Sequence, residues 1–462
     1  MVSDWKKITL GEACEKIQTG PFGSQLHKAD YVVEGIPSIM PVNIGDNRII
    51  TDGIARISEK DAKRLSRYLV KSGDIIYSRR GDVERRALVS DRENGWLCGT
   101  GCLRVSFDRY LVDPEYASFQ LGSPDSREWI VRHAIGATMP NLNTSILSAL
   151  PFLLPPLPEQ KAIAHILGSL DDKIELNRRM NASLEGMVQA LFKSWFVDFD
   201  PVIDNAIKAG NPIPEELAER AEVRRQALAD GTANREAAKQ FPAAFQLTEE
   251  IGWIPEGWEM KTFGNILRSV SDTYPVKTVD KVVFLNTGDI LDGRFLHQNL
   301  SETVGLPGQA KKSICKEDIL YSEIRPINRR FAYVYFDSPK HVVSTKLMVL
   351  RATSGISSLF VYLILKQDST INYLQMMAES RSGTFPQITF DILSKIEIAL
   401  PKELEVVTTF TEIILKPTFQ KQLKNDSVAE ELTNLRDTLL PKLISGELRI
   451  PEAEKLTEEA LA

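Results

Sequence analysis

Three features are missing from this sequence of 462 residues, and each absence narrows the class of protein. No run of about 18 or more apolar residues occurs, which predicts no membrane-spanning helix and no membrane partner. The first residues lack the apolar stretch of a secretory signal, so we expect a cytoplasmic protein. The four cysteines, Cys14, Cys98, Cys102 and Cys315, lack the spacing of a zinc site, which favours reduced, mostly buried thiols and no bound metal.

The short motifs of common catalytic sites are absent too. The sequence contains no phosphate-binding loop, no dinucleotide fingerprint, no serine-hydrolase motif and no zinc-protease motif. The Asn/Asp-Pro-Pro-Tyr motif, with which an amino-methyltransferase would hold a flipped base, does not occur either. The five histidines are dispersed along the chain. We therefore expect no catalytic residues.

The net charge of −6 argues mildly against a nucleic-acid partner, because such proteins often carry basic domains. The arginines nevertheless form local clusters, and the local field matters more than the sum for docking on a duplex.

The sequence contains one unit written twice. Residues 138–148 match residues 384–394 in order, and residues 74–78 match residues 318–322. In the same alignment, the pair Arg85 and Arg86 falls on Arg329 and Arg330. Trp5 with Gly11 matches Trp258 with Gly264. Two similar domains suit two similar targets or two halves of one target, such as a two-part DNA site. A tandem duplication with no shared ligand is the alternative.

Each copy is predicted to be an α+β domain. Short apolar or β-branched runs at 36–42, 74–78 and 102–106 predict strands, and 114–133 predicts a helix. The second copy repeats this order, with strands at 282–285, 318–322 and 347–350 and a helix at 359–377.

Between and after the domains, apolar residues recur every three or four positions, as in a packing helix. From 158 to 198 this spacing predicts a helix of about 40 residues, roughly 60 Å long, which needs a partner helix. Residues 425–441 repeat the spacing, so we expect two long antiparallel helices and pseudo-two-fold symmetry. Pro417 should kink or split the second helix, which should stop near Pro441. Asn177 and Asn181 either set the register of the pair or flank its seam.

The predicted segments are a first domain at 1–157, a central helix at 158–200, a connecting segment at 201–250, a second domain at 251–401, a C-terminal helix at 402–450 and a tail at 451–462. The connecting segment should contain a charged helix at 215–229 between two turns.

Five stretches, at residues 155–160, 170–177, 190–201, 253–258 and 435–447, together resemble one protein family, the type I restriction-modification specificity subunits. Residues 155–160, 170–177 and 190–201 look like the central conserved region of that family, and 435–447 looks like its C-terminal conserved region. Residues 253–258 look like the usual start of the second target-recognition domain. The resemblance covers essentially the whole chain in the right order.

The resemblance implies that each domain reads one half of a bipartite sequence in double-stranded DNA, and that the helix pair fixes the gap between the halves. The helices would dock two modification subunits, which carry the S-adenosylmethionine chemistry and methylate adenine. Restriction subunits would add cleavage driven by ATP, with Mg. The chain itself would be no enzyme and would hold no cofactor. A two-domain protein-binding scaffold without DNA recognition is the main alternative, and a nuclease–methylase fusion is weakened by the missing motifs.

One departure from the family pattern concerns the second copy. Residues 401–405 differ from the proline-rich stretch at 155–160, and Pro417 has no counterpart in the first helix, so the two docking faces need not be equivalent.

The loops after the two Tyr-Ser strands are the first choice for DNA contacts, because arginine reads guanine while Asn and Gln read adenine. The repeated loop before each long helix is the second choice. The candidate DNA-binding residues are Arg79, Arg80, Arg85, Arg86, Thr138, Asn141, Arg325, Asn328, Arg329, Arg330, Thr384 and Gln387. Some of these arginines could instead pair on the surface with Asp82, Glu84 or Glu323. Tyr77 and Tyr321 are expected in the core.

Overall fold

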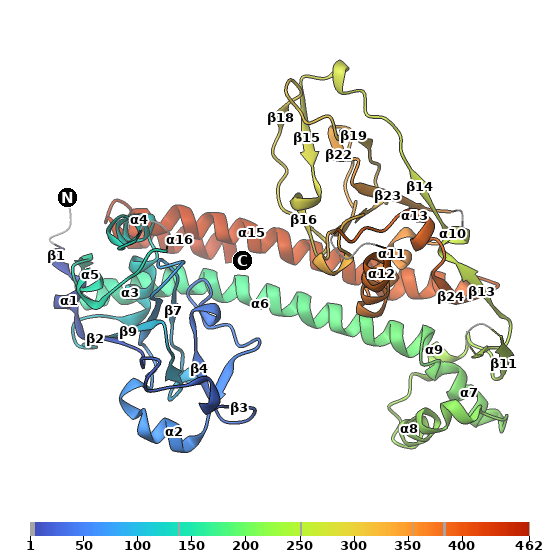
Figure 1. The fold of residues 1–462 in the computed structure, drawn as a ribbon, viewed down its shortest axis with the longest axis horizontal. Helices are drawn as coiled ribbons and strands as arrows, with labels where there is room; N and C mark the ends of the chain where they lie inside the picture. Colours follow the sequence, from blue (N-terminus) through green and yellow to red (C-terminus); the bar gives the residue numbers. More distant parts are fainter. Residues whose placement is uncertain (1–4, 137–138, 250–251, 354, 382–384, 462) are drawn as a thin grey trace. The chain divides into compact units, whose positions relative to one another are not determined.

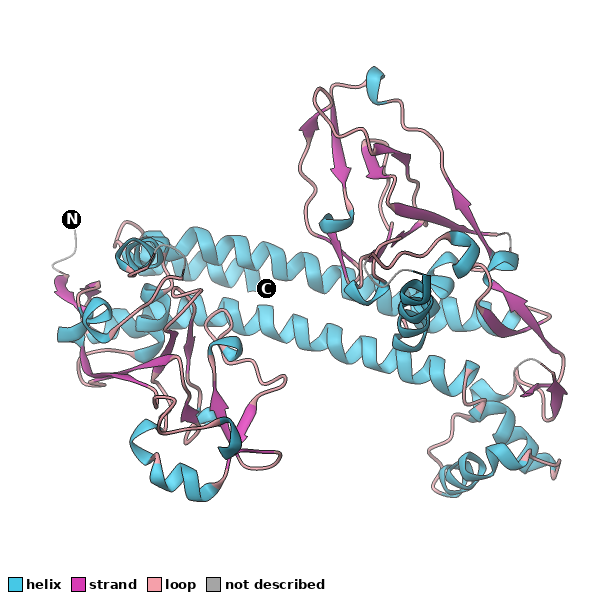
Figure 2. Cartoon of the chain, in the orientation of Figure 1, coloured by secondary structure: helices cyan, strands magenta, loops and turns pink. Residues whose placement is uncertain are grey.

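The computed structural model describes residues 5–136, 139–249, 252–353, 355–381 and 385–461. The chain packs as two compact units, one formed by Met1–Met180 with Lys424–Ala462 and the other by Asn181–Leu423. Each unit contains one α+β domain and part of both long helices, as Figures 1 and 2 show. The predicted fold class is confirmed. Among the described residues, no helix is both long enough and apolar enough to cross a membrane.

The domain of the first unit contains ten strands and five α-helices among its described residues. The strands are β1 Lys6–Thr9, β2 Cys14–Thr19, β3 Tyr31–Val32, β4 Ile36–Ile39, β5 Ala55–Ile57, β6 Ile75–Ser78, β7 Arg86–Leu88, β8 Leu97–Cys98, β9 Cys102–Phe107 and β10 Pro151–Leu154. The helices are α1 Leu10–Ala13, α2 Glu59–Arg64, α3 Pro114–Leu121, α4 Pro124–His133 and α5 Thr144–Ser148. One sheet has the order β2-β9-β6-β7, a second has the order β3-β5-β4-β8, and β1 pairs with β10.

The second unit repeats the first of these sheets and the terminal strand pair. Its domain has the strands β13 Trp258–Thr262, β14 Leu267–Val270, β15 Lys281–Leu285, β16 Ile290–Leu291, β17 Arg294–Phe295, β18 Ser301–Glu302, β19 Ala310–Ser313, β20 Ile319–Ser322, β21 Phe331–Tyr333, β22 His341–Ser344, β23 Leu347–Ala352 and β24 Glu397–Pro401. Its helices are α10 Phe263–Ile266, α11 Ser358–Leu365, α12 Asp368–Arg381 and α13 Phe390–Leu393. The sheet β14-β23-β20-β21 corresponds to β2-β9-β6-β7, and β13 with β24 corresponds to β1 with β10, whereas the other four-stranded sheet has the order β18-β15-β22-β19. A parallel pair recurs as well, β4 with β8 in one domain and β15 with β22 in the other.

The central strand of each domain is buried on both faces. In β6, Ile75 and Tyr77 enter one hydrophobic cluster while Ile76 enters another. In β20, Ile319 and Tyr321 lie in one cluster and Leu320 in a second. A strand covered on both sides requires a nearly continuous apolar run, which is why these stretches stood out in the sequence.

The hairpin that follows the central strand differs in length between the domains. Tyr77 lies opposite Arg86, whereas Tyr321 lies opposite Phe331, so the second connection is one residue longer. The predicted alignment of Arg86 with Arg330 is therefore wrong, because Arg86 corresponds to Phe331. The longer loop contains a 3-10 turn at Pro326–Asn328 that is flanked by two non-glycine residues of positive φ.

Each predicted helix before the repeated loop consists of two helices. In the first domain Gly122 ends α3, and Ser123 caps α4 by accepting a hydrogen bond from the Ser126 amide. Pro124 then occupies the first turn of α4, where its missing N–H costs nothing. The second domain breaks between α11 and α12 without a proline.

The predicted long helices are present. The first, α6 Leu157–Phe196, has 40 residues. In the first unit its buried apolar residues pack against α15 Lys416–Ile444, and Asp171 forms an ion pair of 2.6 Å with Arg436.

In the second unit the two helices are joined by a reciprocal pair of hydrogen bonds. The Asn181 side-chain amide donates to the Gln422 carbonyl at 3.1 Å, and the Gln422 amide donates to the Asn181 carbonyl at 3.2 Å. Further along, the rings of Phe192 and Phe410 lie 6.4 Å apart. As the residue number rises along α6 from 181 to 192, the number of the contacting residue falls from 422 to 410, so the two helices are antiparallel. The Asn181 side chain contributes one of the hydrogen bonds between them.

Pro417 does not split the second helix. The chain is helical from α14 Glu405–Thr409 through a π-helical turn at Phe410–Leu415 into α15, whose first turn contains Pro417. The wider turn accommodates the proline, which has no N–H to donate. The helix also continues past Pro441 to Ile444. The predicted tail forms a further helix, α16 Ile450–Leu461, whose Ala453 is packed in the core of the first unit.

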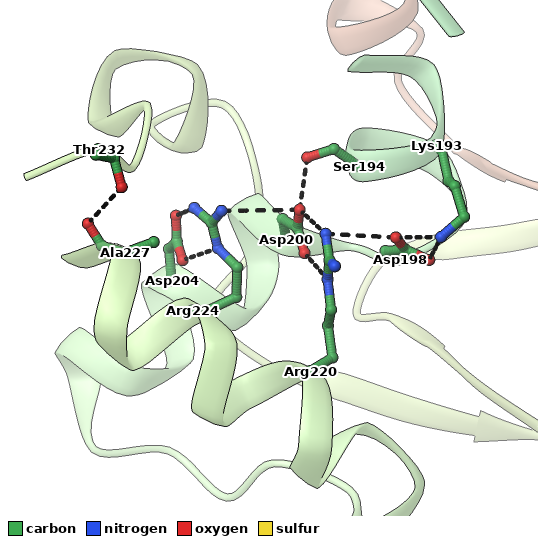
Figure 3. A network of polar contacts seen from close by, with 9 residues as sticks. All are labelled: Lys193, Ser194, Asp198, Asp200, Asp204, Arg220, Arg224, Ala227 and Thr232. Carbon is green, nitrogen blue, oxygen red and sulfur yellow. Dashed lines mark hydrogen bonds and ion pairs between the residues drawn. The ribbon is translucent and has the colours of Figure 1, made fainter. Parts of the chain in front are cut away.

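The connecting segment is fixed to the end of α6 by buried charges (Figure 3). It contains α7 Asp200–Ala209, α8 Ala218–Ala229, α9 Arg235–Ala238, β11 Phe245–Thr248 and β12 Gly252–Pro255. Asp200 is buried and accepts hydrogen bonds from Ser194 at 2.7 Å and from Arg220 at 2.6 Å. Asp204 accepts from Arg224 at 2.8 Å. Buried carboxylates with charged, hydrogen-bonded partners hold α8 against α7.

Candidate nucleic-acid interface

Two loops that lie far apart in the sequence meet at the end of β6. The Arg79 amide donates to the Gly101 carbonyl at 2.8 Å, and the Arg79 carbonyl accepts from the Leu142 amide at 2.8 Å. Arg80 forms a β-bridge with Asn141. The first-choice and second-choice loops of the sequence analysis are therefore one continuous surface feature.

The second domain brings the corresponding loops together in the same way. The Glu323 amide donates to the Lys346 carbonyl at 3.0 Å, and the Glu323 carbonyl accepts from the Ile388 amide at 2.8 Å. Ile324 forms a β-bridge with Gln387. We call these two features the first and second strand-end loops, comprising residues 79–85 with 139–142 and residues 323–330 with 385–388.

A buried serine shapes the turn at the start of each strand-end loop. The Ser78 hydroxyl donates to the Arg80 carbonyl at 2.9 Å, and the Ser322 hydroxyl donates to the Ile324 carbonyl at 3.3 Å. Short hydroxyl side chains commonly satisfy the backbone two residues on in such turns. This role explains why the serine recurs at the end of both strands.

The predicted DNA-binding residues differ in their accessibility. Four are exposed, namely Arg80, Arg85, Arg325 and Asn328. Five are half-buried, namely Arg79, Asn141, Arg329, Arg330 and Gln387. Thr138 and Thr384 lie outside the described residues.

Arg86 is buried and holds the domain together. Its Nε donates to the Ser118 carbonyl at 2.7 Å, and a Cβ added to Gly122 would overlap its guanidinium. Burial lowers the pKa of Arg86. A side chain that is 6% exposed and tied to α3 is not available to a large ligand, so we leave Arg86 out of the candidate interface.

Some of the other arginines also have protein partners. Arg85 forms a surface ion pair with Asp82 at 3.0 Å, which was the alternative to a DNA contact. Arg329 pairs with Asp368 and lies 3.7 Å from Asp292. Arg330 donates to the carbonyls of Gly288 and Ile290 at 3.0 and 2.9 Å. Exposed pairs such as Arg85 with Asp82 are weak and exchange readily for a phosphate, whereas Arg330 is anchored.

Two residues at the loops were missed by the sequence analysis. Phe22 is 52% exposed, and its ring centroid lies 5.8 Å from the guanidinium carbon of Arg79. Lys346 forms an ion pair with Glu323 at 3.5 Å. An aromatic residue within Gly20-Pro-Phe-Gly23 was the available signal for Phe22, because such a turn places its side chain at the surface.

Below the loops, both domains use the same supporting pair. Asp74 precedes β6 and lies 3.7 Å from Arg104 of β9, and Asp318 precedes β20 and accepts two hydrogen bonds from Arg351 of β23 at 2.7 and 2.8 Å. Tyr77 and Tyr321 are buried as predicted, and burial raises the pKa of both phenols.

The side chains of the strand-end loops can form hydrogen bonds and ion pairs with a ligand. Within the described ranges, no group of three or more His, Cys, Asp or Glu side chains is placed to hold a metal ion. Cys98 and Cys102 are buried, Cys14 is half-buried and Cys315 is exposed. Burial raises the pKa of the Cys98 thiol to about 12.

Comparison with known proteins finds one family over both domains. The family model of the type I restriction modification DNA specificity domain matches residues 2–186 and 255–426. The chain is 29% identical to the type I restriction enzyme HindI specificity subunit of Haemophilus influenzae, over 97% of this chain and 100% of that protein. It is 23% identical to the MjaIX specificity subunit of Methanocaldococcus jannaschii, over 92% and 89% of the two chains. The crystal structure of an S subunit from M. genitalium superposes with a TM-score of 0.54 at 17% identity, over 95% of this chain and 96% of that one, which supports the fold.

Proposed function

The chain belongs to the family of type I restriction-modification specificity subunits, and we propose that its two domains each read one half of a bipartite sequence in double-stranded DNA. The main observation that supports this proposal is that the same pair of loops meets once in each domain, at the end of the corresponding strands β6 and β20. Exposed arginines in both strand-end loops supply the donors that phosphates and guanine edges accept. The long helices α6 and α15 would set the number of base pairs between the two halves.

The partners follow from the role of a specificity subunit, which is itself not catalytic. Two modification subunits would dock on the long helices and bring S-adenosylmethionine to an adenine of each half. Restriction subunits would add ATP- and Mg-dependent cleavage. Four of the six segments predicted from the sequence would carry these roles. Residues 1–157 and 251–401 would recognise DNA, and the helices at 158–200 and 402–450 would dock the modification subunits. The assembly would act in the cytoplasm, where its DNA lies.

Co-expression with a modification subunit tests this proposal. Adenine methylation mapped across the host genome by single-molecule sequencing should show a two-part motif with a fixed gap. Absence of new methylation from a stable, assembled complex would contradict the proposal.

DNA binding by the assembled complex gives an independent test. Affinity for a duplex that contains the motif should fall steeply between about 50 and 200 mM salt, because phosphate contacts release counterions. A protein-binding scaffold would instead give a partner interaction that hardly responds to salt over this range.

A further inference from the structure

The residue directly after the central strand has opposite charge in the two domains. Arg79 and Glu323 occupy the same backbone position, because each donates its amide to the loop before the neighbouring strand and accepts from the repeated loop. Each also precedes the residue that forms the β-bridge. The two strand-end loops therefore present a cation and an anion from one shared position.

The guanidinium of Arg79 is free for an external acceptor. Within the described part of the chain, it takes part in no ion pair or hydrogen bond, and its Nε is buried without a partner. The guanidinium carbon of Arg79 lies over the Phe22 ring, 5.8 Å from the ring centroid. The N–H groups of a guanidinium lie in its own plane, where they can make a bidentate contact.

The carboxylate of Glu323 forms an ion pair with Lys346 and interacts electrostatically with Lys312. Lys346 lies 3.5 Å away, and the Lys312 ammonium donates to the carbonyls of Thr345 and Leu347 at 3.2 and 2.8 Å. Burial lowers the pKa of Lys312. Their positive charges offset the repulsion between a carboxylate and DNA phosphates. A carboxylate with one charged partner retains lone pairs that can accept from an amino group.

We propose that this position sets opposite base chemistry in the two half-sites, with Arg79 reading a guanine in the first and Glu323 reading a cytosine amino group in the second. Guanine offers two acceptors in the major groove, which match an arginine, and cytosine offers an N–H donor, which matches a carboxylate. Phe22 is a positioning residue that orients Arg79. The inference rests on the proposed function and adds to it the bases that two named residues read.

The test maps methylation motifs for the complete complex and its variants. The wild-type motif should contain a guanine in the first half whose preference disappears in Arg79→Ala and returns in part in Arg79→Lys. The second half should contain a cytosine whose preference disappears in Glu323→Ala and returns in part in Glu323→Gln, whose amide oxygen still accepts. Arg92→Ala and Glu219→Ala, two exposed changes away from the loops, are the matched controls.

Base analogues test the contact without relying on a variant that folds. Replacing the assigned guanine by 7-deazaguanine removes one acceptor and should slow methylation by wild-type protein roughly 10- to 100-fold, with no further loss in Arg79→Ala. Phe22→Leu should weaken the preference for guanine over the other bases at the assigned position, in the same direction as Arg79→Ala but by a smaller factor.

The outcomes separate the two proposals. If the wild-type complex methylates no bipartite motif, the proposed function fails and this inference fails with it. If a bipartite motif appears but both halves keep every base preference in Arg79→Ala and Glu323→Ala, only this inference is overturned. An unchanged rate of methylation on the 7-deazaguanine duplex would overturn it as well.

Discussion

In both recognition domains, a buried aspartate precedes the central strand and an arginine of the neighbouring strand faces it. The residues of the strand-end loops, which follow the same central strands, differ between the domains. The loop after β20 is one residue longer than the loop after β6, and its first residue is Glu323 where the first domain has Arg79. The strands and the aspartate–arginine pair that position the loops recur in both domains. The length of the loops and the side chains that they expose differ. A duplicated chain can in this way keep one fold and read two different sequences.

The largest difference in stability between the domains should appear at the supporting aspartates. Asp318→Ala removes a fully buried carboxylate that accepts two close hydrogen bonds from the partly exposed Arg351, so we expect a loss of about 2–3 kcal/mol in the second domain. Asp74→Ala should cost less, about 1–2 kcal/mol, because Arg104 lies 3.7 Å away. Hydrogen exchange read by mass spectrometry localises each loss to its strand. Equal losses would contradict the comparison, and the exposed Asp82→Ala is the control.

A second comparison concerns the segments that follow the two long helices, since charges hold α7 and α8 while apolar contacts hold α16. Arg224→Ala leaves Asp204 buried without its partner and should cost about 2–3 kcal/mol of local stability. The neighbouring Arg225→Ala breaks only an exposed pair with Glu222 and should change stability by less than about 0.5 kcal/mol.

Limited proteolysis measures the difference in local stability between Arg224→Ala and Arg225→Ala. Cleavage between residues 200 and 230 should accelerate in Arg224→Ala and stay at the wild-type rate in Arg225→Ala. Similar rates for the two variants would show that the buried pair does not hold the segment.

In the first domain, replacing an exposed arginine should affect DNA binding, whereas replacing a buried arginine should affect stability. Arg80→Ala should weaken DNA binding by the assembled complex by about 1 kcal/mol and reduce the salt slope by about 1, with an unchanged melting temperature. Arg86→Ala should lower the melting temperature instead, because it removes the buried hydrogen bond from Arg86 to the Ser118 carbonyl. A stable Arg86→Ala variant with specifically impaired DNA binding would return Arg86 to the interface.

The smallest effect is expected at the two recurring tyrosines. Their buried hydroxyls have no hydrogen-bond partner among the residues that the structure describes, so Tyr77→Phe and Tyr321→Phe should leave stability unchanged or raise it by about 0.5–1 kcal/mol. Tyr116→Phe is the matched control, because that hydroxyl donates to the Leu153 carbonyl at 3.0 Å and its loss should cost about 1 kcal/mol. Chemical denaturation measures all three. A loss of more than about 1 kcal/mol in both test variants would contradict the prediction.

Much of the frame was predictable from the sequence, because the repeat and the three-to-four spacing of α6 are local patterns. The loop after β20 was not, since its left-handed residues Arg325 and Arg329 are not glycines that would mark the turn. Arg85 and Arg86 look alike in the sequence, yet one is exposed and the other is buried against α3. The meeting of Arg80 with Asn141 depends on tertiary packing, which spacing does not encode.

Exchange of one domain tests the central claim most directly. Residues 1–157 are replaced by the corresponding domain of another specificity subunit, the complex is assembled with its modification subunit, and methylated adenines are mapped across a genome. If each domain reads its own half, one half of the motif will change while the other half and the gap stay the same. A motif that changes in both halves, or in neither, would contradict the account.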